Sequence, residues 1–288
     1  MLRVSGPILL TLLATIFALD MAGAERPKVI YGEDNRVDYF EVTDPVQREL
    51  ANSTVALVRA HNVQIRDQVA ELTTESYSKS YGLCTQEPYY EQETAAFCSG
   101  FLVAPDVIVT AGHCVTNSAA CERTRFVFGF RLNSPGEQPR AVPAEHVFSC
   151  KNLIHSVARG QGEDFAVVRL DRPVTHVAPL AYRISGRPQA GEALEVMGHP
   201  AGLPLKVASG ASVRHVHSEY LVANLDTYGG NSGSAVFNAV THEVEGVLVR
   251  GEADFEYRSG CATSKRCDNQ GCRGEDVTLF ERVLPYLQ

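Results

Sequence analysis

Ser232 lies in the stretch TYGGNSGSAVF, residues 227–237, which places three glycines and a second serine around one candidate nucleophile. A serine hydroxyl attacks a carbonyl effectively only when a base removes its proton and an acid orients that base. N–H donors must also face the oxygen that becomes negatively charged. Glycines let the backbone turn such donors toward one point, so the N–H groups of Gly230 and Ser232 are candidates for an oxyanion hole. The stretch alone leaves a plain flexible loop open as the alternative.

The candidate base is His113, near the end of the stretch CSGFLVAPDVIVTAGHC, residues 98–114. Two apolar runs flank Ala-Pro-Asp in this stretch, which predicts a hairpin whose second strand delivers the histidine. The candidate acid is Asp164, which directly precedes the apolar run FAVVRL. Taken singly, His113 fits a half-buried core histidine and Asp164 fits a solvated loop acid. Together with Ser232 they supply the base, the acid and the nucleophile of one reaction.

The matching motifs around these residues are TAGHC at 110–114, DFAVVRL at 164–170 and GNSGS at 230–234. In these motifs and their order the chain resembles the secreted trypsin-like (chymotrypsin-fold) serine peptidases, over residues 53–288. The resemblance implies that Ser232 is the nucleophile, that His113 is the general base and that Asp164 orients His113. It implies peptide-bond hydrolysis, with protein or peptide substrates.

The resemblance also implies a disulfide between Cys98 and Cys114, which brackets the histidine loop. The chain has eight cysteines, an even number that favours disulfides in an exported protein. The six others allow fifteen pairings, which the sequence leaves open. The spacing from Cys261 to Cys272 has no nearby histidine and no CxxC pair, so a zinc site is disfavoured. We expect no metal and no cofactor.

Asn231 marks a departure from the digestive enzymes of the family, which place an aspartate directly before the serine to receive a new N-terminal ammonium. An asparagine cannot form that ion pair, so any activation is expected to work differently. The GNSGS loop and the stretch KVIYGEDNR, residues 28–36, resemble bacterial extracellular peptidases, including glutamyl endopeptidases.

Specificity for the residue on the amino side of the scissile bond (P1) is left open by the sequence. Asp226, six residues before Ser232, stands where trypsin-like enzymes carry the carboxylate that selects Lys or Arg, which favours a basic P1 residue. Thr227 matches the glutamyl enzymes, but Leu248 stands where these carry a histidine, and Arg250 is the nearby substitute for it. Acidic and apolar or broad preferences therefore remain alternatives.

The strand Val249-Arg250-Gly251 is expected to pair with an extended substrate through backbone hydrogen bonds. At Gly251 the missing side chain is expected to leave the mouth of the specificity pocket open. A simple turn glycine is the alternative at this position.

Residues 1–24 read as a signal peptide, with a basic start, an apolar run of twelve residues and a small-residue cleavage site. Residues 25–48 are expected to be an N-terminal arm or a short propeptide, cut near Arg26 or Lys28. The net charge is −8, and this acidic balance disfavours nucleic acid and anionic lipid as partners. We expect a secreted or periplasmic monomer, with no membrane association once the signal peptide is removed.

Short β-branched runs recur between turn signals, which predicts an all-β protein. With the resemblance, they indicate two six-stranded antiparallel β-barrels with the active site in the seam, plus a short C-terminal helix. The expected bounds are 49–288 for the peptidase domain, 49–172 for the first barrel, 190–275 for the second barrel and 276–288 for the helix. Residues 45–51 are expected to form a brief helix. The competing class is a catalytically silent binding module on the same fold.

Overall fold

Six antiparallel strands close into a first barrel in the order β10-β12-β13-β9-β8-β3. A computed structural model describes residues 29–287, so the expected signal peptide lies outside the described residues. The strands of this barrel are β3 Thr54–Arg59, β8 Cys98–Ala104, β9 Val107–Thr110, β10 Thr124–Phe128, β12 Val147–Ala158 and β13 Asp164–Leu170. The β8–β9 pair is the hairpin predicted around Ala-Pro-Asp.

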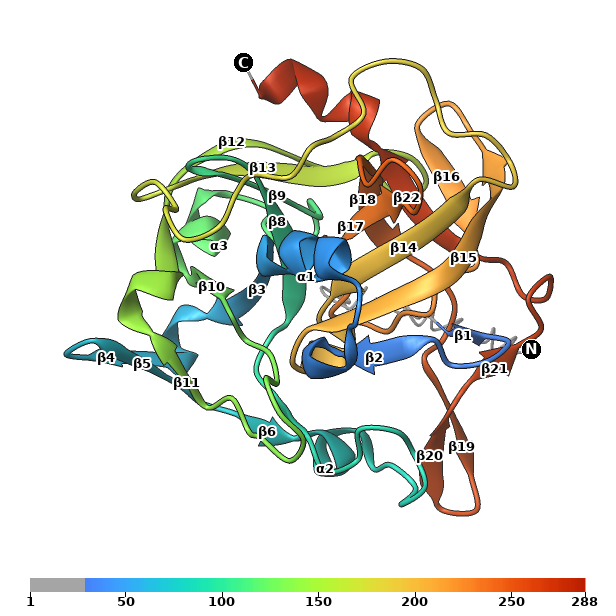
Figure 1. The fold of residues 1–288 in the computed structure, drawn as a ribbon, viewed down its shortest axis with the longest axis horizontal. Coiled ribbons are helices and arrows are strands. Elements are labelled where there is room, and N and C mark those ends of the chain that lie inside the picture. Colours follow the sequence, from blue (N-terminus) through green and yellow to red (C-terminus); the bar gives the residue numbers. More distant parts are fainter. Residues whose placement is uncertain (1–28, 288) are drawn as a thin grey trace, which may run out of the picture.

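A second barrel stands beside the first (Figure 1). Its strands are β14 Ala193–Gly198, β15 Lys206–Val216, β16 Tyr220–Ala223, β17 Ala235–Asn238, β18 Val244–Arg250 and β22 Glu275–Leu279. They pair in the order β14-β17-β18-β22-β16-β15, and the β14–β15 pairing closes the ring. Strand β2, Arg36–Asp38, adds to the outer side of β15. The prediction of two six-stranded antiparallel barrels is confirmed.

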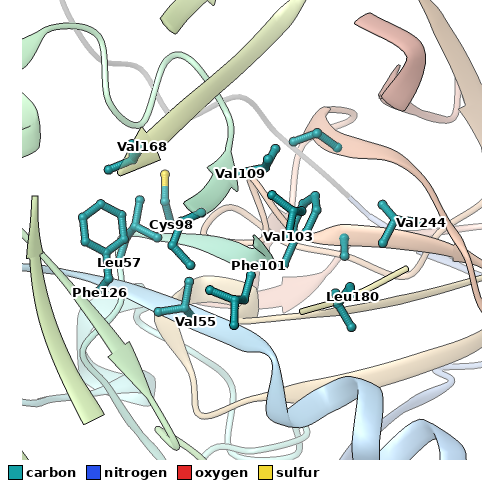
Figure 2. Close-up of a cluster of buried hydrophobic side chains, with 14 of the residues drawn as sticks. Val55, Leu57, Cys98, Phe101, Val103, Val109, Phe126, Val168, Leu180 and Val244 are labelled. Atoms are coloured by element: carbon teal, nitrogen blue, oxygen red, sulfur yellow. The ribbon is translucent and has the colours of Figure 1, made fainter. Parts of the chain in front are cut away.

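Apolar side chains fill the space inside and between the barrels. Figure 2 shows part of this core, where first-barrel residues such as Phe101 and Val55 lie near Leu180 of the connector and Val244 of β18. Strand side chains alternate between faces, so each buried strand contributes to the core with every second residue. This continuous core fixes the two barrels relative to each other, and it therefore also fixes the residues that lie between them.

The C-terminal segment differs from its prediction. Residues Glu275–Leu279 form the strand β22, where a helix was expected from residue 276, and helical structure begins only at Phe280. Two short 3-10 turns follow, Phe280–Arg282 and Leu284–Tyr286. The apolar spacing of this segment suits both forms, and pairing with β16 and β18 decides for the strand. The second barrel therefore extends past its predicted end at residue 275.

Helices are few and short in the described chain. The predicted brief helix is α1, Pro45–Asn52, whose first turn is capped by the Asp44 carboxylate on the N–H groups of Val46 and Gln47. The others are α2 Tyr77–Tyr81 and α3 Ser118–Glu122, with 3-10 turns at Tyr39–Glu41, Ala60–Asn62, Ala144–His146 and Pro200–Gly202. No described helix is long and apolar enough to cross a bilayer.

Four small sheets lie outside the two barrels in the described chain. They are formed by β1 Ile30–Tyr31 with β21 Arg266–Cys267, by β4 Val63–Arg66 with β5 Val69–Leu72 and β11 Ala141–Pro143, by β6 Glu75–Ser76 with β7 Glu93–Thr94, and by β19 Phe255–Arg258 with β20 Cys261–Ser264. The β1–β21 pair is parallel, and it fastens the N-terminal arm to the second-barrel side of the molecule.

All eight cysteines are paired, as Cys84–Cys261, Cys98–Cys114, Cys121–Cys150 and Cys267–Cys272. The second of these pairs is the one that the sequence resemblance implied. Disulfides of this number are typical of proteins that fold in an oxidising compartment.

Candidate active site

His113 lies in the turn that follows β9, between the two barrels. The turn packs tightly because Gly112 has no side chain: a Cβ there would lie 1.9 Å from the carbonyl oxygen of Val157. The adjacent Cys114 ties the turn to Cys98 at the start of β8. The imidazole is therefore presented by a fixed piece of backbone, while its side chain keeps 28% exposure.

Asp164, the first residue of β13, binds His113 through both of its carboxylate oxygens. The distance from Oδ2 to His113 Nδ1 is 2.9 Å, and the backbone N–H of His113 donates to Oδ1 at 3.1 Å. Asp164 is fully buried, so these bonds form away from competing water. A carboxylate on Nδ1 holds the proton there and leaves Nε2 as the nitrogen that can accept one.

Thr278 of β22 holds the backbone of Asp164 from the other barrel. Its hydroxyl accepts from the Asp164 N–H and donates to the Asp164 carbonyl oxygen, both at 3.2 Å. Sequence reasoning missed this residue, because β22 was expected to be helical and its contact with Asp164 spans 114 positions.

Ser232 lies in the loop between β16 and β17, against the histidine turn. Its carbonyl oxygen accepts from the Ser99 N–H at 2.8 Å and lies 3.7 Å from Cys114 Sγ. Gly233 brings this loop even closer to β8 and β9, since a Cβ there would lie 2.1 Å from the Ser99 carbonyl oxygen. The structure thus brings the loop of the candidate nucleophile to the turn that carries the candidate base.

The N–H groups of Gly230 and Ser232 donate no hydrogen bond to another described residue, whereas those of Asn231, Gly233 and Ser234 all do. The orientation of both free groups follows from their peptide planes, in which N–H and C=O point in opposite directions. The carbonyl preceding Gly230 accepts from the Ala201 N–H at 2.5 Å, and the carbonyl preceding Ser232 accepts from the Ser234 N–H at 2.9 Å. Two donors are therefore held free in advance, as an oxyanion hole requires.

The conformation of this loop depends on glycine. Gly230 has φ +86°, and a Cβ there would lie 2.6 Å from the His199 carbonyl oxygen. The Gly230 carbonyl oxygen accepts from Ser99 Oγ at 2.8 Å, and the same hydroxyl accepts from the His199 N–H at 2.9 Å. Ser99 thereby links the loop to the first barrel. It is a second residue that sequence reasoning did not identify, since a serine within a strand gives no signal of its own.

Asn231 is buried, and its side-chain oxygen accepts from Ser234 Oγ at 3.3 Å. This contact lies within the loop. The asparagine therefore stabilises the loop through a neutral hydrogen bond.

Asp226 holds the N-terminal arm. Its Oδ1 accepts from the Tyr31 N–H at 2.7 Å and its Oδ2 accepts from the Asn35 N–H at 2.9 Å. Burial raises the pKa of Asp226 to about 6, while these two backbone bonds act in the opposite direction. Next to it, the Thr227 N–H donates to the Val29 carbonyl oxygen at 3.3 Å. Asp226 and Thr227, two of the residues predicted to bind substrate, thus contact the arm.

Of the three residues predicted to border the substrate, Val249 and Arg250 end β18 and Gly251 follows it. Arg250 turns its buried guanidinium toward Asp276, with Nε 3.0 Å from Oδ2, and toward the Gly162 carbonyl oxygen. Its Nη1 lies 4.0 Å from Asp164 Oδ2. Arg250 therefore lies with the candidate triad. Val249 is fully buried in the core.

Gly251 lies against a carboxylate that the sequence analysis did not single out. A Cβ on Gly251 would lie 1.8 Å from Oε2 of Glu275, which is fully buried. The Thr227 hydroxyl donates to the same oxygen at 3.2 Å. Glu275 escaped notice because it lies at the predicted end of the second barrel and meets Thr227 across 48 positions.

The candidate ligand atoms of Cys98, His113 and Cys114 lie within 4.8 Å of one another. Because the two cysteines form a disulfide, this group offers no thiolates to a metal ion.

Comparison with known proteins identifies the family of this chain. The model of the trypsin-like peptidase domain family matches residues 98–247, just over half of the chain. The chain belongs to this family.

Among the relatives, the glutamyl endopeptidase of Bacillus licheniformis is 28% identical over 149 residues, which cover 49% of this chain and 45% of the relative. Snake venom serine protease BthaTL of Bothrops alternatus is 31% identical over 144 residues, or 49% of this chain and 58% of the relative. The chain thus spans about half the length of these relatives.

A solved structure of Glu endopeptidase in complex with MPD superimposes with a TM-score of 0.52 and 19% identity. The match covers 89% of this chain and 97% of that structure, and it shows a shared fold.

Proposed function

We propose that this chain is a serine endopeptidase that hydrolyses peptide bonds through a covalent acyl-enzyme. The observation that carries the proposal is the pair of bonds from buried Asp164 to His113, next to a serine loop with two free N–H groups. Ser232 Oγ attacks the scissile carbonyl, and His113 Nε2 takes the hydroxyl proton. The N–H groups of Gly230 and Ser232 bind the resulting oxyanion, an effect worth about 3 kcal/mol per donor.

The intermediate then collapses and the C–N bond breaks. His113 gives its proton to the leaving amine, and the acyl group remains as an ester on Ser232. In the second half-reaction His113 removes a proton from water, which attacks the ester and releases the acid product. Asp164 stabilises the imidazolium that forms in each half.

A fluorophosphonate probe tests this proposal, because it reacts with an activated serine whatever the substrate preference is. We expect covalent labelling of Ser232, and we expect Ser232→Ala to lower kcat for peptide hydrolysis on the order of 10⁵-fold or more. A silent binding module on the same fold would leave the probe unreacted. Hydrolysis that continues unchanged in the Ser232→Ala protein would show that the assignment is wrong.

We further propose a preference for Lys or Arg at P1. Two buried carboxylates lie at Thr227: Asp226 precedes it in the chain, and Glu275 accepts from its hydroxyl. Charge complementarity favours a cationic side chain there. The name of the glutamyl endopeptidase relatives favours an acidic P1 residue instead. Against that reading, Leu248 replaces the histidine that the resemblance calls for, and the charge of Arg250 faces Asp276. Cleavage of a peptide library gives the answer, and products ending in Glu would contradict the basic preference.

Export and maturation complete the proposal: the signal peptide 1–24 directs the chain to a secreted or periplasmic location, and a cut near Arg26 or Lys28 forms the mature N-terminus within the arm. The four disulfides support an oxidising compartment. The contacts of Tyr31 and Asn35 with Asp226 support an arm that stays with the mature protein. N-terminal sequencing of the exported protein tests both points; a first residue at Glu25 would remove the second cut.

A further inference from the structure

Arg250 was expected to border the substrate, but its side chain turns into the protein. The side chain is only 7% exposed, and its guanidinium lies between two buried carboxylates. Nε is 3.0 Å from Asp276 Oδ2, and Nη1 is 4.0 Å from Asp164 Oδ2. The charge of Arg250 is therefore directed at the acid of the candidate triad.

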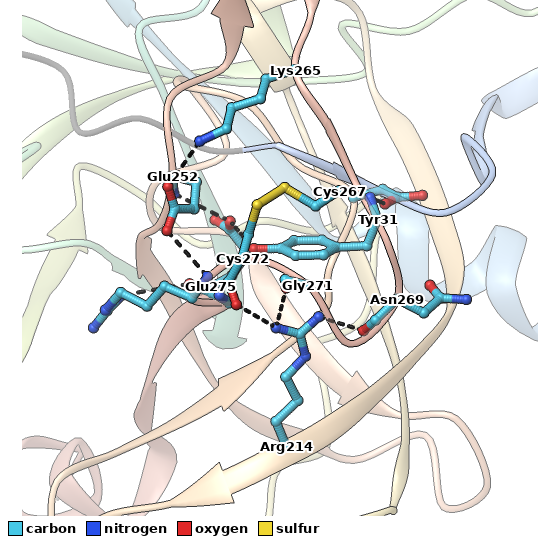
Figure 3. The surroundings of a disulfide bond; sticks show 12 residues. Tyr31, Arg214, Glu252, Lys265, Cys267, Asn269, Gly271, Cys272 and Glu275 are labelled. Atoms are coloured by element: carbon cyan, nitrogen blue, oxygen red, sulfur yellow. Dashed lines mark hydrogen bonds and ion pairs between the residues drawn. A yellow bond between two sulfur atoms is a disulfide. The ribbon is translucent and has the colours of Figure 1, made fainter.

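The side of β22 that Arg250 meets follows from the geometry of the sheet. Arg250 and Asp276 are cross-strand partners in the pairing of β18 with β22. Successive side chains of a strand point to opposite sides, so Asp276 and Glu275 face apart. Figure 3 shows the side of Glu275, which lies near the hydroxyl end of Tyr31. The side of Asp276 faces Arg250 and, beyond it, the candidate triad.

The same guanidinium holds the segment that leads into β13. Nη2 donates to the Gly162 carbonyl oxygen, and Nη1 lies 3.5 Å from the Arg159 carbonyl oxygen. Both carbonyl groups come shortly before Asp164 in the chain. The contact with Gly162 joins the two barrels across 88 positions. One planar group with several N–H donors thus contacts both the carboxylate of Asp164 and the backbone in front of it.

Burial strengthens the electrostatic effect of Arg250. Asp164 and Asp276 are both buried, so water screens their interactions with the guanidinium only weakly. A nearby cation favours the ionised form of a buried carboxylate. The Asp164 oxygen that lies 4.0 Å from Arg250 is also the one that binds His113 Nδ1. The cation therefore opposes the positive charge that His113 acquires when it takes a proton.

The other charges of this loop and its neighbours pair with one another. Glu163 forms ion pairs with Arg159 and with Arg282. Glu219 lies 3.9 Å from the first of these arginines and 3.7 Å from the second. Both arginines reach solvent, where ion pairs have little effect at a distance.

Two more titratable groups face this region. Arg273 binds the same Asp276 carboxylate at 2.7 Å, but its side chain is 46% exposed. His155 lies on β12, which packs against the histidine turn, and its ring stacks on Tyr286. Burial lowers the pKa of His155, so this residue is neutral at pH 7. Arg273 thus offers a reference charge at the surface of the network to which Arg250 belongs.

We propose that Arg250 is a positioning residue of the reaction, which holds Asp164 ionised and in place and sets the pH at which Ser232 becomes reactive. This inference rests on the proposed function, because it concerns the same triad. Its physical basis is that an imidazolium on His113 is less stable with a buried guanidinium 4.0 Å from its partner carboxylate. Neutral His113, the form that can accept the serine proton, is favoured accordingly.

The test measures the rate of fluorophosphonate labelling of Ser232 as a function of pH, which requires no knowledge of the P1 preference. Arg250→Met removes the charge and keeps an unbranched side chain. We expect it to raise the midpoint of the pH profile by about one unit. Arg250→Lys keeps the charge and should bring the midpoint back to within about 0.3 units, with a lower maximal rate because an ammonium lacks the planar fork.

Arg273→Met is the matched control, because it removes a charge from the same Asp276 at an exposed position. Its midpoint should stay within about 0.2 units of the wild type, since water screens that charge. A shift in this control as large as that in Arg250→Met would overturn the inference. The ion pair with Asp164 would then have no special effect.

Asp276→Asn keeps the test decisive if Arg250→Met does not fold. This variant removes the anion that Arg250 also faces and keeps an oxygen that can accept from Nε. The positive charge then acts on the triad with less compensation, so the midpoint should fall by about half a unit. A purely structural role of Arg250 would not move the midpoints of two variants in opposite directions.

The outcomes separate this inference from the proposed function. Labelling of Ser232 with an unchanged midpoint in Arg250→Met, or with a raised midpoint in Asp276→Asn, would overturn the inference and leave the proposed function standing. Absence of labelling in the wild type would overturn both.

Discussion

Asp164 illustrates how much a single side chain depends on its partners. Both of its oxygens bind His113, and its backbone binds the Thr278 hydroxyl of the other barrel. A fully buried carboxylate is tolerated only when its lone pairs are used in this way. In the proposed reaction the same contacts prepare His113 for proton transfer, because they hold its ring in one tautomer.

Replacing Asp164 by Asn should therefore change chemistry more than structure. The amide keeps the shape of the carboxylate but can donate to Nδ1, which would favour the wrong tautomer of His113. We expect kcat for peptide hydrolysis to fall about 10⁴-fold at neutral pH while the thermal unfolding midpoint changes little. The expected pattern is a large loss of kcat in a protein whose circular dichroism spectrum or crystal structure is unchanged. A kcat within tenfold of the wild type would contradict the role of Asp164.

His199 provides a test of stability against pH. Burial lowers its pKa to about 3, and its Nδ1 lies 3.0 Å from the Leu203 carbonyl oxygen, to which it donates. The unfolded chain takes up the proton near pH 6.5 while the folded chain does not. The free energy of unfolding should therefore fall as pH drops from about 6.5 to about 3, with a slope of up to about 1.4 kcal/mol per pH unit from this group.

The variant His199→Gln isolates this contribution, because an amide can donate to the same carbonyl without titrating. Between pH 7 and pH 4.5, urea unfolding should show a loss of stability about 2–3 kcal/mol larger in the wild type than in the variant. Equal losses in the two proteins would mean that His199 does not stay neutral in the folded state.

The loop that carries Ser232 works as a unit in which glycines permit contacts that side chains would block. Gly230 and Gly233 both have positive φ, and both lie against backbone atoms of other segments. Gly233 packs on the carbonyl oxygen of Ser99, and Gly230 packs on that of His199. The loop is therefore pressed between strands of both barrels, which keeps its free N–H groups in one orientation.

Gly233→Ala should destabilise the fold by more than about 3 kcal/mol, since φ is +90° and the new Cβ would lie 2.1 Å from a carbonyl oxygen. Gly160→Ala is the matched control, because a Cβ there meets no atom within 4 Å and its φ lies outside the left-handed region. Chemical denaturation should place the control within about 0.5 kcal/mol of the wild type. Similar values for the two variants would show that the loop can relax around residue 233.

Disulfides connect distant parts of the molecule. Cys84–Cys261 joins the segment before the first barrel's second strand to β20, across 177 positions, whereas Cys267–Cys272 spans only 5. A cross-link restricts the unfolded chain more when it closes a longer loop. The two bonds should therefore contribute unequally to the stability of the whole chain.

By loop-closure entropy, removing Cys84–Cys261 through paired serine substitutions should cost about 5 kcal/mol, and removing Cys267–Cys272 about 2 kcal/mol. Unfolding in guanidinium chloride under non-reducing conditions measures both. A larger loss from the short loop than from the long one would contradict this order.

Local patterns were enough to predict the two barrels, the β8–β9 hairpin, the α1 helix and the family, because alternation, turn residues and the motifs around His113, Asp164 and Ser232 are encoded in short stretches. The free N–H groups of the serine loop also follow from its glycines. Other features depend on residues that are far apart in the chain. The contact of Asp226 with the N-terminal arm spans 195 positions, and that of Thr227 with Glu275 spans 48. The C-terminal strand, the pairing of six cysteines and the hydrogen bonds of Thr278 with Asp164 all depend on such contacts. Packing between segments that are distant in sequence selects among local conformations of similar energy. These features are therefore decided only by the tertiary structure.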